Sequence, residues 1–287
     1  MNSKKRLAAE NMFTGKPMVS IVIPVYNQVA FTRQCLKTIV HNTPPGLYEI
    51  IVVDDASTDE TPELLSSWKG KLRAIRSEKN NGFGCACNEG AKAALGQYLV
   101  FLNNDTKPLP KWMEYCIEHF QRDPNVGIVG NKLLYPNGTI QHGGITFVPL
   151  QKLSGVEFLP LQKLGNVPFP LHRFRGMKWD DPQANRCEEV HSITAACLFI
   201  PRELFWSVGG FSEEYGMYFE DADLNMKIRA LGRKIIYEPR SVVIHYESQS
   251  TPTHVGNELL IRSVHIFYAK WRHKLENLLA GNLYPTS

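Results

Sequence analysis

Short runs of apolar, largely β-branched residues alternate with segments of helical pattern along the first half of the chain. The runs, which we predict to be strands, span residues 19–27, 49–57, 72–77, 97–105 and 126–130, and the helical patterns lie near 29–41, 60–68, 84–95 and 109–121. Strands that are apolar on both faces and alternate with helices are typical of a parallel sheet covered by helices on either side. In such sheets ligands bind beyond the carboxyl ends of the strands. The polar residues that end these runs are therefore the first candidates for chemistry.

The pattern loosens after residue 130. Residues 131–190 are rich in Gly, Pro and isolated polar residues, and they predict hairpins and long loops over the sheet. Beyond them we predict a strand at 196–201, helices at 202–208 and 220–231, and two more strands at 234–239 and 241–246. The sequence thus predicts an α/β protein with a mostly parallel central sheet.

The last predicted helix is basic and amphipathic. Its apolar side holds Leu260, Val264, Phe267 and Trp271, and its cations lie elsewhere at Arg262, Lys270, Arg272 and Lys274. Such a helix either packs its apolar side onto its own domain or lies against an anionic membrane surface, here through residues 256–279. No apolar run approaches the roughly 18 residues that a membrane-spanning helix requires.

Composition excludes several classes of protein. The 287 residues carry a formal net charge of +4 and are 43% hydrophobic, which is ordinary for a globular protein and far from the basic footprint of a nucleic-acid binder. The six cysteines include no Cys-x-x-Cys pair, which suits a reducing compartment, and no signal peptide opens the chain. We therefore expect a cytoplasmic protein, with peripheral contact at the inner membrane face as the alternative that the basic helix leaves open. The sequence does not indicate an oligomeric state.

Two carboxylates, Asp54 and Asp55, end the second predicted strand. Because successive strand side chains point to opposite faces, one of the two can face a crevice while the other caps the turn through Ser57. A carboxylate in that place suits the ring N–H of a uracil or thymine, since a charge-assisted hydrogen bond is stronger than a neutral one. The plainer alternative is an Asp-rich turn after a strand.

Asn103, Asn104 and Asp105 end the fourth predicted strand. One carboxylate with a neighbouring amide can hold a divalent cation and its diphosphate, and the plainer alternative is an Asx-rich turn. His245 follows the last predicted strand. There an imidazole is either a structural residue or a ligand that favours manganese over magnesium.

The stretch FEDADLNMKIRALG, residues 219–232, crowds Glu220, Asp221 and Asp223 at the start of a helix. The helix dipole favours acidic side chains in a first turn, and this alone can explain them. The catalytic alternative is that one carboxylate takes a proton from an alcohol, which is too weak a nucleophile at neutral pH without a base. Two common phosphate-binding loops are excluded, because Cys87 stands where a dinucleotide fingerprint needs its third glycine and no Walker-type loop is present.

Six blocks of the chain resemble, in order, the signature blocks of family 2 glycosyltransferases with the GT-A fold. They are SIVIPVYNQ, IIVVDDASTDET, NNGFGCACNEGAKAALGQYLVFLNND, ITAACLFIPRELFWSVGGF, YFEDADLNMKIRALG and VIHYES. The resemblance covers roughly residues 18–250. It implies a central sheet flanked by helices, with a small second sheet and acceptor-side loops.

The resemblance also implies a division of the chain. Residues 1–17 would be a polar N-terminal segment, 18–130 the nucleotide-sugar-binding half of a single GT-A domain, 131–250 the acceptor-binding and catalytic half, and 251–287 a C-terminal amphipathic helical segment. The implied reaction is inverting and metal-dependent, with Mn²⁺ or Mg²⁺. One sugar would move from a UDP- or dTDP-sugar to a hydroxyl of a glycan or glycolipid, in the synthesis of a surface polysaccharide.

Site residues follow from the same resemblance. The implied nucleotide-binding residues are Pro24, Tyr26, Asn27, Asp55, Asn80, Gly82, Phe83, Asn88 and Asn104. Asp105 and His245 would hold the metal. Asp221 would be the catalytic base and Glu220 would contact the acceptor, while Asp223 keeps the role of a helix start.

The sequence departs from the family pattern in places. The usual Asp-x-Asp is here Asn103-Asn104-Asp105, with one charge fewer, and Ala56 and Ala195 stand where glycine is frequent. The Gln-x-x-Arg-Trp block of processive synthases is missing, which favours addition of a single sugar. The depleted metal motif keeps open a catalytically silent sugar-nucleotide or glycan-binding module. A nucleotidyltransferase fits less well, because no basic phosphate loop follows the first predicted strand.

Overall fold

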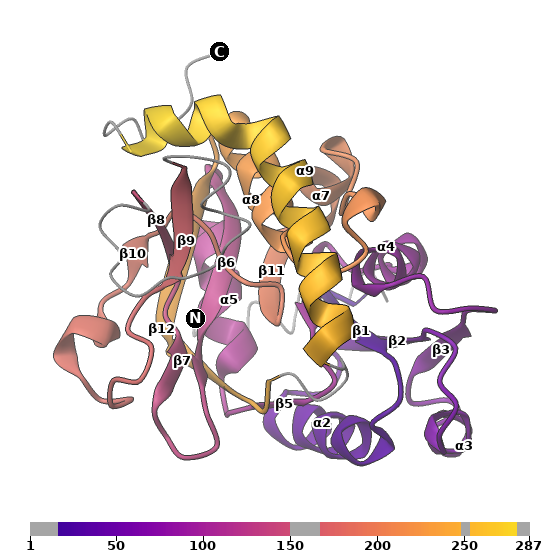
Figure 1. The fold of residues 1–287 in the computed structure, drawn as a ribbon. Coiled ribbons are helices and arrows are strands. Elements are labelled where there is room, and N and C mark those ends of the chain that lie inside the picture. The colour runs from indigo at the N-terminus through magenta and orange to yellow at the C-terminus, as the bar shows by residue number, and fades with distance from the viewer. Residues whose placement is uncertain (1–16, 150–166, 248–252, 280–287) are drawn as a thin grey trace.

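A ten-stranded sheet runs through the molecule, with helices packed on both of its faces (Figure 1). The computed structural model describes residues 17–149, 167–247 and 253–279, with side chains of the last range from residue 258 onward. The strands of the sheet are β1 (Val19–Val25), β2 (Tyr48–Asp54), β3 (Arg73–Arg76), β4 (Tyr98–Leu102), β5 (Thr106–Pro108), β6 (Val126–Leu134), β7 (Ile140–His142), β10 (Glu188–Glu189), β11 (Cys197–Pro201) and β12 (Lys234–His245). A separate pair, β8 (Ile145–Pro149) and β9 (Pro168–His172), forms the small second sheet that the resemblance implied.

The helices are amphipathic segments between these strands. They are α2 (Val29–Asn42), α3 (Thr61–Ser67), α4 (Phe83–Ala93), α5 (Trp112–Arg122), α7 (Arg202–Ser207), α8 (Glu220–Ala230) and α9 (Thr253–Leu279), with short 3₁₀ turns η2 (Pro182–Asn185) and η3 (Glu213–Tyr215). Each helix predicted before residue 232 is present, with ends that differ from the prediction by a few residues. The prediction of an α/β protein with a mostly parallel sheet is confirmed.

Strand order determines where a ligand can bind. The main path of the sheet runs β10-β12-β6-β11-β4-β1-β2-β3, in which β11 is antiparallel to both of its neighbours. From β1 the chain moves outward through β2 and β3, and it then returns to place β4 on the other side of β1. The order therefore reverses between β1 and β4, which is the point where open α/β sheets bind ligands.

Two apolar clusters hold the layers together. On one face, Leu36 of α2 and Trp112 of α5 are fully buried in the same cluster as alternate residues of β1. On the other face, α4 and α8 pack through residues such as Cys87 and Leu224. Each large apolar side chain buried in this way contributes about 1.5–3 kcal/mol. Because helices cover both faces of the sheet, the central strands are apolar on both sides (Figure 1).

The prediction of two separate strands near the end of the sheet is wrong. Residues 234–245 form one strand, β12, which is parallel to β6 with register shifts that include one between Glu238 and Val242. Pro239 lies in that shift. Proline has no N–H for a ladder hydrogen bond, so it is tolerated where pairing is interrupted, and a bulge replaces the break that the sequence suggested.

The C-terminal helix α9 lies across the outside of α8 and the small sheet (Figure 1). Its apolar residues Val264, Phe267, Trp271 and Leu275 are buried in a cluster with Phe147 of β8 and Met226 of α8. Of the two interpretations of this segment, packing on its own domain is therefore the one that accounts for the apolar side. No helix in the described part of the chain is long and apolar enough to cross a membrane.

Candidate active site

A cavity of about 430 Å³ opens at the carboxyl edge of the sheet, where the strand order reverses between β1 and β4. Its walls come from the ends of β1, β2, β4 and β12, the loop before α4, the first turn of α8, and the first part of α9. Eleven of the predicted site residues line it: Pro24, Tyr26, Asp55, Asn80, Gly82, Phe83, Asn104, Asp105, Glu220, Asp221 and His245. Residues that are up to 221 positions apart in the chain thus share one cavity.

Two predicted nucleotide-binding residues are not among the lining residues. Asn27 has a positive φ of 59°, and its side-chain oxygen accepts the backbone N–H of Thr58 at 2.7 Å, which joins the loops after β1 and β2. Asn88 is buried in α4, where its amide donates to the carbonyl oxygen of Phe211 at 2.9 Å and accepts the N–H of that residue at 3.0 Å. Both amides therefore hold loops in place.

The two carboxylates at the end of β2 face different surroundings. Asp54 accepts the backbone N–H of Ser57 at 2.8 Å and pairs with Arg76, so the expectation that one carboxylate caps the turn through Ser57 is confirmed. Asp55 faces the cavity. Its oxygens accept the backbone N–H groups of Asn81 at 3.0 Å and Gly82 at 2.9 Å. This fixes the loop before α4 and leaves lone pairs on the carboxylate for a further donor.

Gly82 marks a close approach between the two halves of the chain. Its φ is 90°, and a Cβ atom at this position would lie 2.5 Å from the carbonyl oxygen of Gly216. No other residue fits both the left-handed backbone and this contact. The loop before α4 therefore rests directly on the segment that leads into α8, and both line the cavity.

The pairing of β5 with β12 brings His245 to Asp105. His245 lies opposite Thr106 in this antiparallel ladder, and the N–H of Tyr246 donates to the carbonyl oxygen of Asp105 at 3.0 Å. The imidazole Nε2 lies 3.2 Å from Oδ1 of Asp105, and both side chains are more than nine-tenths buried. This Oδ1 has no hydrogen-bond partner among the described residues.

Gln141 of β7 determines which ring nitrogen of His245 carries the proton. Its amide nitrogen donates to the carbonyl oxygen of His245 at 3.4 Å, and its amide oxygen lies 2.6 Å from Nδ1. Nδ1 therefore donates to this oxygen, and in the neutral imidazole Nε2 carries the lone pair on the side of Asp105. A carboxylate oxygen and an imidazole nitrogen 3.2 Å apart can hold a divalent cation between them, and a partner on the far ring nitrogen is usual for a histidine ligand.

The remaining residues of the Asn-Asn-Asp motif have different roles. The amide nitrogen of Asn103 lies 3.4 Å from Nε2 of His245, so this position offers the site a neutral amide in place of a second carboxylate. Asn104 is buried and donates to the hydroxyl of Thr32 at 2.9 Å, which ties β4 to the start of α2. A cation held here would therefore face one negative charge from this motif.

Glu220 and Asp221 enter the cavity from the first turn of α8. Asp221 accepts the backbone N–H of Ala195 at 3.1 Å and that of Ala222 at 2.7 Å, one on each carboxylate oxygen. Glu220 is buried, and its Oε2 has no hydrogen-bond partner among the described residues. Burial and the neighbouring charge of Asp221 raise the pKa of Glu220 to about 8. One carboxyl of this pair is therefore neutral at pH 7.

Asp223 does more than begin a helix. It lies in the first turn of α8 as expected, but it is fully buried and accepts hydrogen bonds from Ser212 at 2.7 Å and from the indole of Trp271 at 2.8 Å. Lys270 lies 2.7 Å from it and Lys227 3.2 Å. Burial alone would raise the pKa of Asp223, and the hydrogen bonds from Lys270, Ser212 and Trp271 more than offset it, so that the pKa is lowered. This carboxylate anchors α9 to the active-site segment.

Several lining residues were not identified from the sequence. Tyr218 and Phe219 line the cavity with positive φ values of 68° and 66°, a backbone conformation that costs a non-glycine residue about 1–3 kcal/mol. His172 of β9 lines it as well, with Nδ1 3.1 Å from Nδ1 of His142, and burial lowers the pKa of His172. Leu260 of α9 completes this wall. His172 belongs to residues 131–190, where no periodicity shows which side chains face inward. Leu260 lies on the apolar side of the last helix, which suggested packing onto the domain rather than a place in a site.

Comparison with known proteins shows which family the chain resembles. The family model described as "Glycosyl transferase family 2" matches residues 20–209, about two thirds of the chain. The O-antigen biosynthesis protein RfbC of Myxococcus xanthus is 32% identical over 239 residues, which make up 82% of this chain and 18% of that protein. The N-acetylglucosaminyl-diphospho-decaprenol L-rhamnosyltransferase of Mycobacterium tuberculosis is 26% identical over 254 residues, covering 82% of this chain and 80% of that enzyme. The chain spans a quarter or less of the length of the first curated relatives it matches.

A solved structure shares the fold. The crystal structure of GalNAc-T7 with UDP, GalNAc and Mn²⁺ superposes with a TM-score of 0.68 over 91% of this chain and 50% of that chain, at 17% sequence identity. This likeness supports the GT-A fold. The matched family model shows that the chain belongs to glycosyl transferase family 2.

Proposed function

We propose that this chain transfers one sugar from a UDP- or dTDP-sugar to a hydroxyl of a glycan or glycolipid, with inversion at the anomeric carbon. The observation that carries the proposal is the arrangement of the cavity. The Asp105–His245 pair lies at the ends of β4 and β12, and the Glu220–Asp221 pair enters from α8 into the same space. A leaving diphosphate and an attacking hydroxyl need these two kinds of group on either side of one sugar.

The donor would lie along the ends of β1, β2 and β4. Pro24 and Tyr26 would flank the base, and a free lone pair of Asp55 would accept the ring N–H of uracil or thymine. The ribose and diphosphate would contact Asn80, Gly82, Phe83 and Asn104, all of which line the cavity. Asn27 and Asn88 would act by holding the surrounding loops rather than by touching the nucleotide.

Asp105 and His245 would hold Mn²⁺ or Mg²⁺. When bound, the ion would neutralise charge that builds up on the departing diphosphate. The imidazole ligand favours Mn²⁺ over Mg²⁺, and the solved GalNAc-T7 structure contains Mn²⁺. With one carboxylate in the site, we expect weaker metal binding than two carboxylates would give.

Asp221 would be the catalytic base. Its carboxylate is held by two backbone N–H groups, so its orientation toward the cavity is fixed before substrate binds. It would take the proton of the acceptor hydroxyl as that oxygen attacks the anomeric carbon from the face opposite the diphosphate, which inverts the configuration. Glu220, buried beside it, would hydrogen-bond the acceptor.

A lipid-linked acceptor and a surface polysaccharide are supported by the names of two relatives, the decaprenol-linked rhamnosyltransferase and the O-antigen biosynthesis protein. Peripheral contact with an anionic membrane through residues 256–279 would depend on exposed cations such as Arg262 and Arg272, because the apolar side of α9 is buried. Electrostatic contact of this kind weakens as salt is raised.

The decisive experiment compares Asp221→Asn with Glu220→Gln in a transfer assay, after a panel of sugar nucleotides has identified the donor. We expect Asp221→Asn to lower kcat at least about 100-fold, because general bases contribute about 10²–10⁴-fold. Glu220→Gln should act mainly on KM for the acceptor. The exposed control Glu276→Gln should behave like the wild type. If Asp221→Asn retains near-normal kcat while Glu220→Gln does not, the assignment of the base moves to Glu220.

A second candidate function is a catalytically silent sugar-nucleotide or glycan-binding module. It is favoured by one observation, the neutral Asn103 next to His245. Calorimetry with UDP and Mn²⁺ measures binding, and a donor-hydrolysis assay detects release of the nucleoside diphosphate. Binding without any release, in the presence of a panel of donors and acceptors, would favour the silent module.

A further inference from the structure

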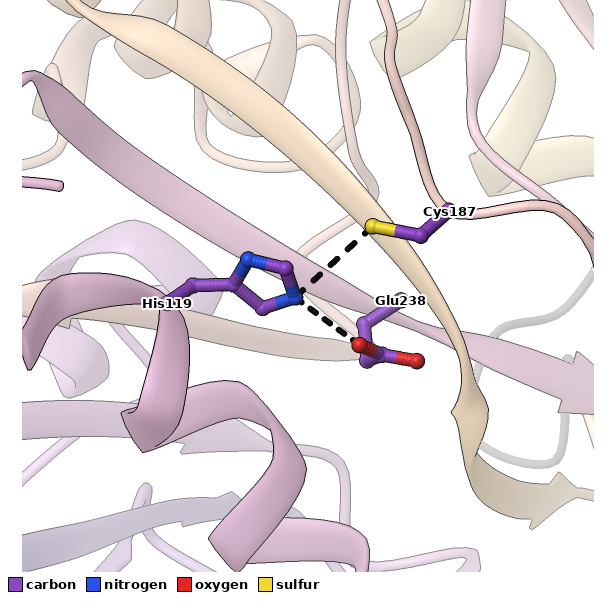
Figure 2. A group of neighbouring side chains, drawn as sticks. All are labelled: His119, Cys187 and Glu238. Carbon is purple, nitrogen blue, oxygen red and sulfur yellow. Dashed lines mark hydrogen bonds and ion pairs between the residues drawn. The ribbon is translucent and has the colours of Figure 1, made fainter. Parts of the chain in front are cut away.

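A second group of metal-ligand side chains lies away from the candidate active site. His119 comes from α5, Glu238 from β12, and Cys187 directly precedes β10 (Figure 2). None of the three lines the active-site cavity. They are separated by at least 51 positions in the chain, so the fold brings them together.

All three converge on one point. Nε2 of His119 lies 2.8 Å from Oε2 of Glu238 and 3.8 Å from Sγ of Cys187, and one ligand atom from each residue lies within 4.8 Å of the others. Figure 2 shows that both contacts reach the same ring nitrogen. In a nucleophile triad the thiol and the carboxylate face opposite nitrogens of the imidazole, so this group is not built for covalent catalysis.

The scaffold around the three residues is rigid. The antiparallel register pairs Glu188 with Tyr237, which puts Cys187 opposite Glu238 at the next position of the ladder. Directly opposed residues lie on the same face of a sheet, and α5 packs over that face. The ligand atoms are therefore positioned by two strands and a helix.

A second layer of contacts holds the carboxylate. Glu238 is fully buried, and Arg240 donates to both of its oxygens, at 2.9 Å from Nε and 2.6 Å from a terminal nitrogen. The guanidinium of Arg240 in turn lies 4.5 Å from the ring centre of Tyr115. These contacts orient the carboxylate and leave its Oε2 directed toward His119.

We propose that His119, Cys187 and Glu238 bind a divalent ion of the zinc class, with a fourth position open to solvent. Thiolate and imidazole ligands select Zn²⁺ or Co²⁺ over the oxygen-seeking Mg²⁺ and Mn²⁺. Bond lengths of about 2.3 Å to sulfur and about 2.0 Å to nitrogen in a tetrahedral site place these two ligands roughly 3.5 Å apart, near the observed 3.8 Å. Cys187 is exposed, so the ion has a route of entry, and the thiol proton leaves as the ion binds.

The ion would fasten the edge strand β10 to the sheet and to α5. Arg240 lowers the negative charge available on Glu238, so the site should bind more weakly than a four-ligand thiolate site. The ion would be separate from the candidate active site, because none of its three ligands lines that cavity.

The test uses Co²⁺ as a spectroscopic probe of the whole, reduced protein. One equivalent should produce a thiolate-to-cobalt charge-transfer band in the near ultraviolet together with visible bands of tetrahedral intensity. Cys187→Ser should abolish the charge-transfer band, and His119→Gln should weaken Co²⁺ binding at least tenfold. The matched control Cys85→Ser replaces another thiol that is not fully buried and should keep the band.

Two outcomes would overturn the proposal. One is a wild-type protein without the charge-transfer band, and the other is a Cys187→Ser protein that keeps it. Cobalt at Asp105 and His245 cannot produce this band, since neither side chain contains sulfur. Thermal unfolding provides a second readout. Zn²⁺ should raise the Tm of the wild type and of Cys85→Ser, and it should raise the Tm of Cys187→Ser much less.

Discussion

At the scale of single residues, Gln141 favours the tautomer of His245 in which Nε2 is free to bind a cation. A histidine with a free Nδ1 can adopt either tautomer, whereas Gln141 holds the proton on Nδ1 through a 2.6 Å contact. In the neutral ring, the lone pair of Nε2 is then on the side of Asp105. The proposed cation site would therefore depend on three residues, of which Gln141 would not touch the ion.

Replacing Gln141 by leucine should lower Mn²⁺ affinity about 10–100-fold, the usual effect of removing a partner behind a metal ligand. The measurement is titration of free Mn²⁺ by electron paramagnetic resonance, which needs no substrate. Gln183→Leu is the matched control, because Gln183 is exposed and remote from the cavity lining. Unchanged Mn²⁺ affinity in Gln141→Leu would mean that His245 is oriented without this contact.

Residues at strand ends and helix starts were accessible to prediction, and residues in irregular segments were not. Asp105, Asp221 and His245 each mark the end or the beginning of a periodic segment, which limits where their side chains can lie. Gln141 belongs to residues 131–190, where no periodicity indicates which side chains face inward. Asn88 shows the opposite error. Its position in a signature block suggested a contact with the nucleotide, whereas its hydrogen bonds to Phe211 hold α4 against the segment before η3.

At the scale of elements, the junction of α8 with α9 depends on Asp223. This buried carboxylate binds Ser212, Trp271, Lys227 and Lys270, and thus connects the segment before η3, α8 and α9. Ser263 of α9 adds hydrogen bonds to the carbonyl oxygens of Tyr215 and Met217. Through Leu260, α9 also forms part of the wall of the candidate active site.

Changing Asp223 to asparagine should destabilise the protein by about 3 kcal/mol, because the buried side chain loses the charge that strengthens its hydrogen bonds from Ser212, Trp271 and Lys270. For a chain of this size, that corresponds to a fall in Tm of very roughly 6–12 °C. Thermal unfolding measures the effect. The exposed pair of Arg272 with Glu276 provides the control, and Glu276→Gln should change stability by less than about 1 kcal/mol. Equal, small effects of both changes would show that Asp223 is not the anchor.

The strands and helices were predictable to the extent that apolar periodicity marks them. Pro239 was taken as the end of a strand, yet β12 continues past it through a bulge, because pairing with β6 resumes at Val242. The residues of β8 and β9 carry no alternation strong enough to place them. Their pairing depends instead on the apolar cluster beneath α9, which a local pattern does not reveal.

At the scale of the whole molecule, Glu220 makes stability depend on pH. Burial and Asp221 raise its pKa from 4.5 to about 8, so the folded protein holds a proton that the unfolded chain releases above pH 4.5. Because the folded state binds more protons across this window, stability falls as the pH rises from about 4.5 to about 8. The buried Glu220 therefore destabilises the folded protein progressively between about pH 4.5 and pH 8.

Glu220→Gln mimics the protonated side chain and should remove this dependence. The variant should gain stability relative to the wild type as the pH rises from 5.5 to 8.5, by about 2–4 °C in Tm for each kcal/mol recovered. Denaturant or thermal unfolding at three pH values measures the difference. For the exposed control Glu276→Gln, the stability difference from the wild type should not change with pH. If the difference for Glu220→Gln also does not change with pH, the pKa of Glu220 is not raised.

The contact between Gly82 and Gly216 has a consequence for anyone who wishes to redesign this enzyme. The backbone carbonyl of one loop occupies the space where the other would carry a side chain. A chimera that imports a foreign segment around position 216 to obtain a new sugar linkage must also keep the local chain path at position 82. If the proposed function holds, acceptor selectivity and donor binding would therefore depend on each other, and we expect successful grafts to exchange both loops together.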